Sequence, residues 1–174
     1  ALLPHIWLSD EEIRQGQRLL EQLPDKAGTP PIALHPYATH PDKAWKEAYW
    51  RQLMELFESR GIPWIVIGRG NGMEGIPASR NFTNRTSLRE TCALLKSSSL
   101  LITGDSGPMH LAGAVGTPVL ALFGPTTEEW GFFPAGPKDR VLESQLDCRP
   151  CTLHGKKHCD RNHACMQSIT PEQV

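Results

Sequence analysis

The residues most suggestive of chemistry are Asp-Ser-Gly-Pro-Met-His at positions 105–110, between an apolar run and a segment of small residues with helical character. A glycine there lets a ligand approach the backbone, and a helix start offers unpaired N–H groups at the positive end of its dipole. These features are typical of a phosphate or pyrophosphate site. A tight turn in which Asp105 serves only as the helix N-cap explains the same residues equally well.

The Gly-Asp-Ser-Gly sequence at 104–107 also surrounds the nucleophile of chymotrypsin-like proteases. Those enzymes are built from β-barrels and carry their His and Asp upstream in a different context. The nucleophile elbow of α/β-hydrolases requires a glycine at the position that Pro108 occupies here. The sequence therefore disfavours serine-hydrolase chemistry.

Cysteines form the second chemical feature, because four of the five lie close together near the end of the chain, at Cys148, Cys151, Cys159 and Cys165. Four thiolates satisfy tetrahedral zinc, although the second pair lacks the close spacing typical of such sites. Three histidines could substitute as ligands, namely His154, His158 and His163. A structural zinc ion competes with one or two disulfides and with free thiols, which together are favoured. The fifth cysteine, Cys92, lies in an apolar helical pattern and is expected to be a buried free thiol.

Helices and strands must position these residues. Capping boxes at 9–12 and 87–90 predict two helix starts, and apolar residues at helical spacing over 45–57 predict a helix that stops at Gly61. A helix of small residues is expected around 110–114. Short apolar runs predict buried strands at 32–35, 64–67, 100–103 and 119–123, with a weak strand at 81–83. Residues 68–77 contain four glycines and predict a loop with at most a short helix.

Strands without alternation that are separated by helices indicate an α/β fold, a Rossmann-like doubly wound parallel sheet. We expect a single domain over 1–174, in which 1–30 form a linker and helix leading in and 145–174 form a Cys/His-rich tail. The tail ends on Thr-Pro-Glu-Gln, which predicts the start of a truncated C-terminal helix. Ligands bind at the carboxyl ends of such strands, so the segments 35–43, 104–110 and 124–127 should converge on one crevice.

Composition excludes several classes of protein. The chain of 174 residues has 18 Lys and Arg against 19 Asp and Glu, a formal charge of −1 that argues against non-specific nucleic-acid binding. With 39% hydrophobic and 21% charged residues the composition is ordinary for a globular protein. No apolar run approaches the length of a membrane-spanning helix. The first residue is Ala1 rather than Met, so we expect a piece of a longer protein.

Residues 101–126, LITGDSGPMHLAGAVGTPVLALFGPT, resemble the hallmark of the bacterial heptosyltransferases, glycosyltransferase family nine. Other segments agree in order: 84–90 resembles the preceding loop and helix of the family, and 39–45 resembles its Thr/Ser-then-Lys-x-Trp loop. The tail from Cys148 to Glu172 resembles the cysteine-bearing end of the family. The resemblance covers nearly the whole chain from Ile32 onward.

The resemblance implies the C-terminal, donor-binding half of a GT-B glycosyltransferase, an enzyme of two Rossmann-like halves. The implied reaction is inverting transfer of heptose from ADP-heptose to the inner core of lipopolysaccharide, in the cytoplasm at the inner face of the inner membrane. In the family the catalytic aspartate and the acceptor site lie in the first half. We therefore expect no catalytic base in this chain, no required cofactor, no nucleic-acid partner, and no turnover by the isolated chain.

Carried over position by position, the resemblance assigns Asp105, Ser106, Gly107 and His110 to the diphosphate and sugar of the donor. The amides of Ser106 and Gly107 would meet phosphate oxygens, and Asp105 suits sugar hydroxyls. Lys43 matches a lysine that stabilises the charge building on the departing ADP, although without the family a solvated loop lysine is the better interpretation.

Further donor-binding positions implied by the resemblance are Thr39, Thr86, Pro108, Met109, Gly124 and Thr126. A pure packing role is the alternative for the last two. The chain departs from the family after its second strand, where a longer helix usually carries a glutamate that contacts the ribose. Here 68–74 is short and rich in glycine, and Glu74 is the nearest acid, so its assignment to the ribose rests on position alone.

Two alternative functions follow from this departure. One is a related GT-B domain that uses another nucleotide sugar, and the other is a non-catalytic binding module with a degenerate crevice. Basic residues of the tail, Lys156, Lys157 and Arg161, fit either a peripheral contact with an anionic membrane surface or a solvated loop. Trp130, Phe132 and Phe133 could cover the donor, but core packing is the favoured expectation.

Overall fold

The computed structural model describes residues 4–25, 28–152 and 159–174 and contains a five-stranded sheet in the order β2-β1-β3-β4-β5. Every neighbouring pair of strands is parallel. The strands are β1 (Ile32–His35), β2 (Trp64–Val66), β3 (Leu100–Gly104), β4 (Val119–Phe123) and β5 (Arg140–Glu143). The predicted α/β fold with a parallel sheet is therefore confirmed.

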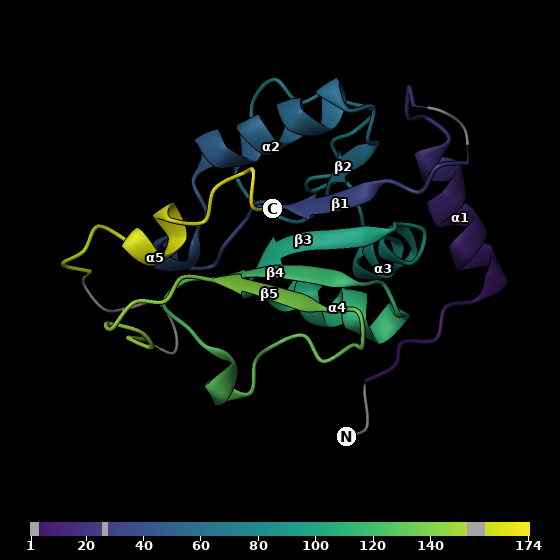
Figure 1. Cartoon of the computed structure of the whole chain (residues 1–174). Helices are drawn as coiled ribbons and strands as arrows, with labels where there is room; N and C mark the ends of the chain where they lie inside the picture. Colours follow the sequence, from purple (N-terminus) through teal and green to yellow (C-terminus); the bar gives the residue numbers. More distant parts are fainter. Residues whose placement is uncertain (1–3, 26–27, 153–158) are drawn as a thin grey trace.

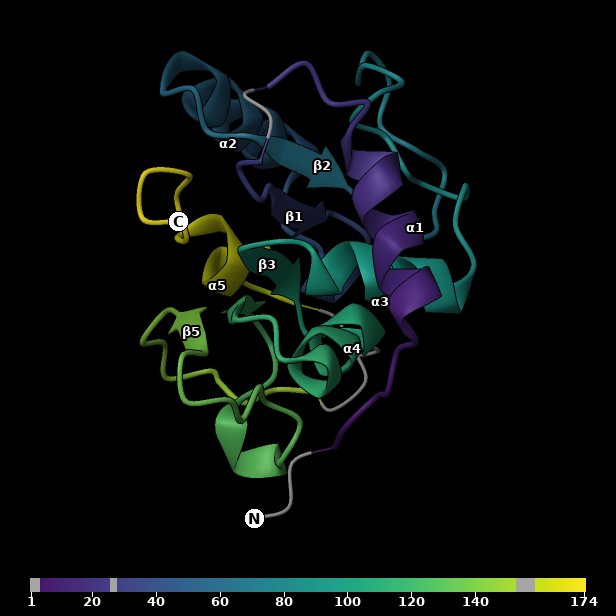
Figure 2. The ribbon, with the colours of Figure 1, turned by 90° about the vertical axis from the view of Figure 1, so that its right-hand side faces the viewer.

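Helices cover both faces of this sheet (Figures 1 and 2). They are α1 (Asp10–Leu20), α2 (Glu47–Ser59), α3 (Leu88–Lys96), α4 (Gly107–Val115) and the short α5 (Ala164–Gln167), with 3-10 turns η1 (Pro41–Lys43) and η2 (Glu128–Trp130). Helices α1, α3 and α4 share one apolar cluster, while α2 and α5 belong to the other. Both predicted capping boxes are formed, each between a serine and the glutamate three residues later.

Close packing of α1 on α3 explains a glycine in the middle of a helix. A Cβ atom on Gly16 would lie 2.8 Å from the backbone of Ala93, so only glycine lets the two helices approach this closely. On the opposite face, Trp50 and Leu53 of α2 are fully buried with Met166 of α5. The sheet is thus covered on both faces by segments of this same chain, which supplies its own hydrophobic core.

Some local expectations from the sequence are corrected by the structure. The edge strand β5 was not predicted, because only its two central residues are partly buried and both ends are exposed. The expected strand at 81–83 is reduced to an isolated bridge between Asn81 and Val66. Phe132 and Phe133 are 53% and 38% exposed, so the expectation of core packing was wrong for them. The loop at 68–77 contains no helix, as its glycines predicted.

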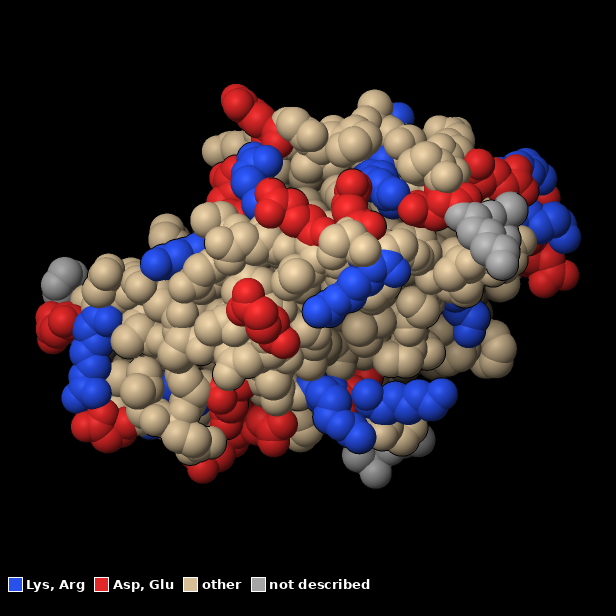
Figure 3. Space-filling model, turned by 45° about the horizontal axis from the view of Figure 1, so that its top comes forward, with Lys and Arg blue, Asp and Glu red and all other residues tan. Residues whose placement is uncertain are grey.

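The surface carries charges of both signs. Figure 3 shows acidic and basic side chains scattered together over one face of the molecule, in keeping with a formal charge of −1. Within the described residues, no helix combines the length and apolarity that crossing a bilayer requires.

Candidate functional site

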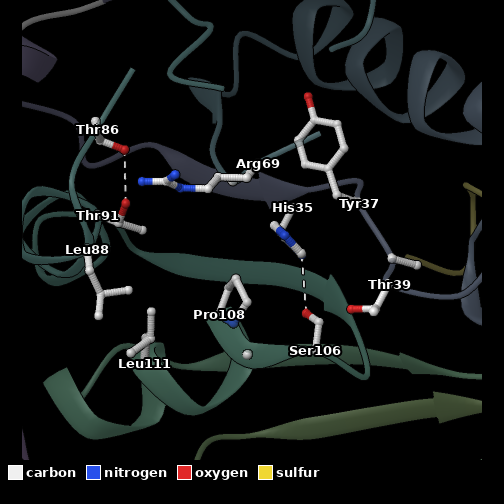
Figure 4. Close-up of a pocket in the computed structure, with 13 residues that line it drawn as sticks. His35, Tyr37, Thr39, Arg69, Thr86, Leu88, Thr91, Ser106, Pro108 and Leu111 are labelled. Atoms are coloured by element: carbon white, nitrogen blue, oxygen red, sulfur yellow. Dashed lines mark hydrogen bonds between the residues drawn. The ribbon is translucent and has the colours of Figure 1, made fainter. Parts of the chain in front are cut away.

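A pocket of about 480 Å³ opens at the carboxyl edge of the sheet, between the loops that follow β1 and β3 (Figure 4). Its lining comes from four segments of the chain: His35, Tyr37, Ala38, Thr39, Gly68, Arg69, Thr86, Leu88, Thr91, Ser106, Gly107, Pro108 and Leu111. The predicted convergence of the segments 35–43 and 104–110 is confirmed. The segment 124–127 contributes no lining residue.

The start of α4 forms one wall of this pocket. Ser106 is the N-cap residue, yet its side chain makes no capping hydrogen bond to the helix. The first amides of a helix have no acceptor one turn earlier, and the dipole places partial positive charge there. A Cβ atom on Gly107 would meet no other atom within 4 Å, so the backbone is open to a ligand at this point. The alternative in which Asp105 is only an N-cap is wrong, since Ser106 occupies that position.

A buried histidine explains why the Ser106 hydroxyl leaves the helix uncapped. Nδ1 of His35 lies 3.0 Å from Oγ1 of Thr103 and 3.2 Å from Oγ of Ser106. The two hydroxyls are themselves 3.0 Å apart. Burial lowers the pKa of His35 to about 4, so the ring is neutral at neutral pH and Nδ1 can accept a hydrogen bond from either hydroxyl. This network directs the serine side chain toward the sheet.

An ion pair lies beside the pocket. Nζ of Lys43 is 2.6 Å from Oδ2 of Asp105, and the two side chains are only 14% and 12% exposed. Shielding from water strengthens the attraction between the two charges, and loss of either partner leaves an unpaired charge. Asp105 therefore holds the ammonium group of Lys43 close to the start of α4, because Ser106 directly follows Asp105 in the chain.

The C-terminal tail holds the loop that carries Lys43. Nε1 of Trp45 donates to the carbonyl oxygen of Ile169 at 2.9 Å, and Nζ of Lys46 donates to Oε1 of Gln167 at 3.0 Å. His163 Nε2 lies 2.8 Å from a carboxylate oxygen of Asp42. These contacts join segments about 120 residues apart, so the tail is part of the framework of the site.

The structure brings together part of the predicted site. Five of the assigned residues line the pocket, namely Thr39, Thr86, Ser106, Gly107 and Pro108. Lys43 and Asp105 form the pair beside it. The side chain of Met109 is buried in the core, and His110 is exposed outside the lining set.

Three further predicted residues lie away from this pocket. Glu74 is exposed, and its backbone oxygen accepts a hydrogen bond from Arg51. Gly124 is buried directly under Met166, where a Cβ atom would clash with the sulfur. The backbone oxygen of Thr126 accepts from a buried arginine, Arg149, which also binds the carbonyl oxygen of Gly124.

Sequence reasoning placed the segment 35–43 at the crevice without assigning a role to His35 or Tyr37. It missed four further lining residues: Arg69, Leu88, Thr91 and Leu111. His35 carried one usable signal, since it is a polar residue at the end of an otherwise apolar strand, where ligand-facing residues gather. Leu88 and Leu111 carried none, because leucines at helical positions predict core packing.

The tail cysteines do not form a metal centre in the described part of the chain. None of the four is joined in a disulfide, and across the described residues no three His, Cys, Asp or Glu side chains are grouped so that they could hold a metal ion. Two of the histidines considered as ligands, His154 and His158, lie outside the described residues, as do Lys156 and Lys157. Arg161 pairs with Asp147. Cys92 is a buried free thiol, as predicted.

Comparison with known proteins matches residues 8–160 to the model of glycosyltransferase family 9 (heptosyltransferase). The chain is 35% identical over 153 residues to lipopolysaccharide heptosyltransferase 1 of Pseudomonas aeruginosa, an alignment of 80% of this chain and 40% of that protein. It is 33% identical over 149 residues to lipooligosaccharide heptosyltransferase 2 of Campylobacter jejuni, covering 76% of this chain and 44% of that one.

The fold matches a solved structure as well. The E. coli ADP-heptose lipopolysaccharide heptosyltransferase II superposes on 99% of this chain with a TM-score of 0.73 at 22% sequence identity, using 51% of its own length. The chain thus spans between 40% and 51% of the length of these proteins. Because the family model covers most of its residues, the chain belongs to glycosyltransferase family 9, the heptosyltransferase family.

Proposed function

We propose that this chain is the donor-binding half of an inverting heptosyltransferase that transfers heptose from ADP-heptose to the lipopolysaccharide core. The observation that carries the proposal is the uncapped start of α4, which faces a pocket next to a shielded lysine. Backbone amides at a helix start bind phosphate groups without any special side chain. The names of the relatives supply the donor and acceptor of the proposal, and they belong to proteins about twice as long.

In the proposed reaction, an acceptor hydroxyl oxygen attacks the anomeric carbon of the heptose, and the bond from that carbon to the diphosphate oxygen breaks. The bonding electrons leave with ADP, and the hydroxyl proton passes to a base. This chain would act on the leaving group: amides of Ser106 and Gly107 hold the diphosphate while Lys43 stabilises its growing negative charge. Asp105 would keep Lys43 in place and offer its carboxylate to hydroxyls of the sugar.

The base and the acceptor site belong, in this proposal, to the other half of the enzyme. An isolated chain should therefore bind ADP and ADP-heptose without transferring heptose. The proposal retains the cytoplasmic location that the resemblance implies. Contact of the tail with a membrane surface stays a prediction.

A matched pair of glycines on α4 tests the proposal. Gly107 faces the pocket and Gly113 lies farther along the same helix, and an added Cβ atom meets no protein atom within 4 Å at either position. We expect Gly107→Ala to weaken ADP binding at least roughly tenfold, because its methyl group takes the space of the phosphate and disturbs charge-assisted hydrogen bonds. Gly113→Ala should leave the affinity unchanged.

Isothermal titration with ADP, ADP-heptose and UDP measures these affinities, and thermal melting verifies that both variants fold. No binding of any nucleotide by the wild-type chain would contradict the proposal. A clear preference for UDP would favour another nucleotide sugar, and heptose transfer by the isolated chain would refute the division of labour between the halves.

A further inference from the structure

Arg69 is a pocket residue to which neither the sequence nor the proposed mechanism gives a role. It lines the pocket from the loop after β2, and it is exposed. Among the described residues, its guanidinium has no hydrogen-bond or ion-pair partner, in contrast to Arg80 and Arg149, which are both paired. A cation left unpaired at the wall of a pocket is available to a ligand.

The backbone on both sides of Arg69 is packed against the floor of the site. Gly68 adopts a φ of +120°, and a Cβ atom there would lie 2.5 Å from the ring of His35. Gly70 is pressed equally closely against the ring of Tyr37. A residue with a Cβ atom cannot occupy either position without moving these rings, so the backbone of the loop is closely packed against them.

A second element holds the same loop from the other side. The side chain of Asn84 accepts from the amide of Gly70 at 3.2 Å and donates to its carbonyl oxygen at 2.7 Å. The backbone N–H of Asn84 donates to the carbonyl oxygen of Gly68 at 2.9 Å, and Asn84 has a left-handed φ of 59°. Arg69 is thus presented from a fixed backbone rather than from a free loop.

The pocket has two chemically different ends. Ser106 and Gly107 lie at the end where α4 begins, whereas Leu88 and Leu111 line the other end. Leu88 is 64% exposed, which leaves its side chain open to a ligand at this end of the pocket. In Figure 4 the side chain of Arg69 extends over the pocket toward this apolar end, in the direction of Thr86 and Thr91. A flat ring placed there would lie between leucine side chains and a guanidinium.

We propose that Arg69 stacks on the nucleobase of the donor and holds it against Leu88 and Leu111, which makes Arg69 a determinant of base specificity. The inference rests on the proposed function, since it takes the diphosphate to lie at the start of α4. A planar guanidinium stacks on aromatic faces, which lysine cannot do in the same way. A purine offers a larger face than a pyrimidine, and inorganic pyrophosphate offers none.

The test compares three ligands on wild-type chain and Arg69→Ala. We expect the variant to bind ADP roughly fivefold to thirtyfold more weakly, UDP with a smaller loss, and inorganic pyrophosphate with unchanged affinity, all by isothermal titration. Arg69→Lys keeps the positive charge but lacks the planar guanidinium, so it should lose most of the ADP affinity that Arg69→Ala loses. Arg60→Ala is the matched control, because Arg60 is an exposed arginine between α2 and β2, at the amino edge of the sheet.

The outcomes separate this inference from the proposed function. Unchanged ADP affinity in Arg69→Ala would overturn the stacking role, and so would an equal loss for pyrophosphate, which would assign Arg69 to the phosphates. Full rescue by Arg69→Lys would likewise reduce the role to charge. Failure of the wild-type chain to bind any of the three ligands would instead remove the proposed function, and the inference with it.

Discussion

At the scale of single residues, the site depends on side chains that are buried or paired rather than freely exposed. His35 is 6% exposed and directs the hydroxyl of Ser106 toward the sheet, which leaves the first amides of α4 for a ligand. Lys43 and Asp105 lie on loops 62 residues apart in the sequence, and Nζ of the lysine is 2.6 Å from Oδ2 of the aspartate. Neither arrangement follows from local sequence, because each partner is ordinary in its own segment and the pairing exists only in the fold.

The buried histidine makes stability depend on pH. Its pKa is about 4 in the folded chain against 6.5 for an unburied imidazole, so between these values the unfolded chain binds a proton that the folded chain does not. The free energy of unfolding is unaffected by this group above that window and decreases as the pH falls through it. Between pH 7 and pH 5 we predict a loss of about 2 kcal/mol from His35.

Urea unfolding at the two pH values measures this loss. His35→Asn keeps a hydrogen-bonding side chain without a titrating ring. Between pH 7 and pH 5 its free energy of unfolding should therefore fall by about 2 kcal/mol less than that of the wild type. Parallel losses in the two proteins would show that His35 is not the group responsible.

At the scale of elements, the sequence predicted what local patterns encode. Both capping boxes, the strands β1 to β4 and the break at Gly61 were predictable, because cap residues and apolar runs specify them within a few positions. Strand β5 escaped prediction because it has no continuous apolar run: only its two central residues are partly buried and both ends are exposed. The assignment of Gly124 to the crevice from family likeness stays untested, and its close contact with Met166 could come only from the fold.

The tail and the Lys43 loop act as one element, and a single hydrogen bond tests this. Trp45→Phe removes the donor to the carbonyl oxygen of Ile169 while it preserves most of the buried ring. An unsatisfied buried acceptor costs about 1–3 kcal/mol, so we expect a loss of that order in urea unfolding. We also expect weaker ADP binding, because the loop that carries Lys43 loses one of its supports.

Trp7→Phe is the control for this change, because Trp7 is 82% exposed. It should alter neither the unfolding free energy nor the affinity for ADP. If Trp45→Phe behaves like Trp7→Phe, the tail does not support the site.

At the scale of the whole molecule, this chain spans about half of the length of the relatives it matches. Its sheet is nevertheless covered on both faces by its own helices, and its pocket is lined from within the described chain. In the proposed function this half binds the donor, whereas transfer needs a base and an acceptor from the other half. The family could be recognised from the contiguous 101–126 motif, but the full lining of the pocket could not, because it is assembled from four separate segments.

The most direct test of the central claim is a titration of the ¹⁵N-labelled chain with ADP, followed by amide chemical shifts. We predict saturable shifts that are largest at the amides of Ser106, Gly107 and Met109, because these groups would donate to or lie beside the diphosphate. Shifts that cluster elsewhere, or no saturable shifts at the start of α4, would contradict the account.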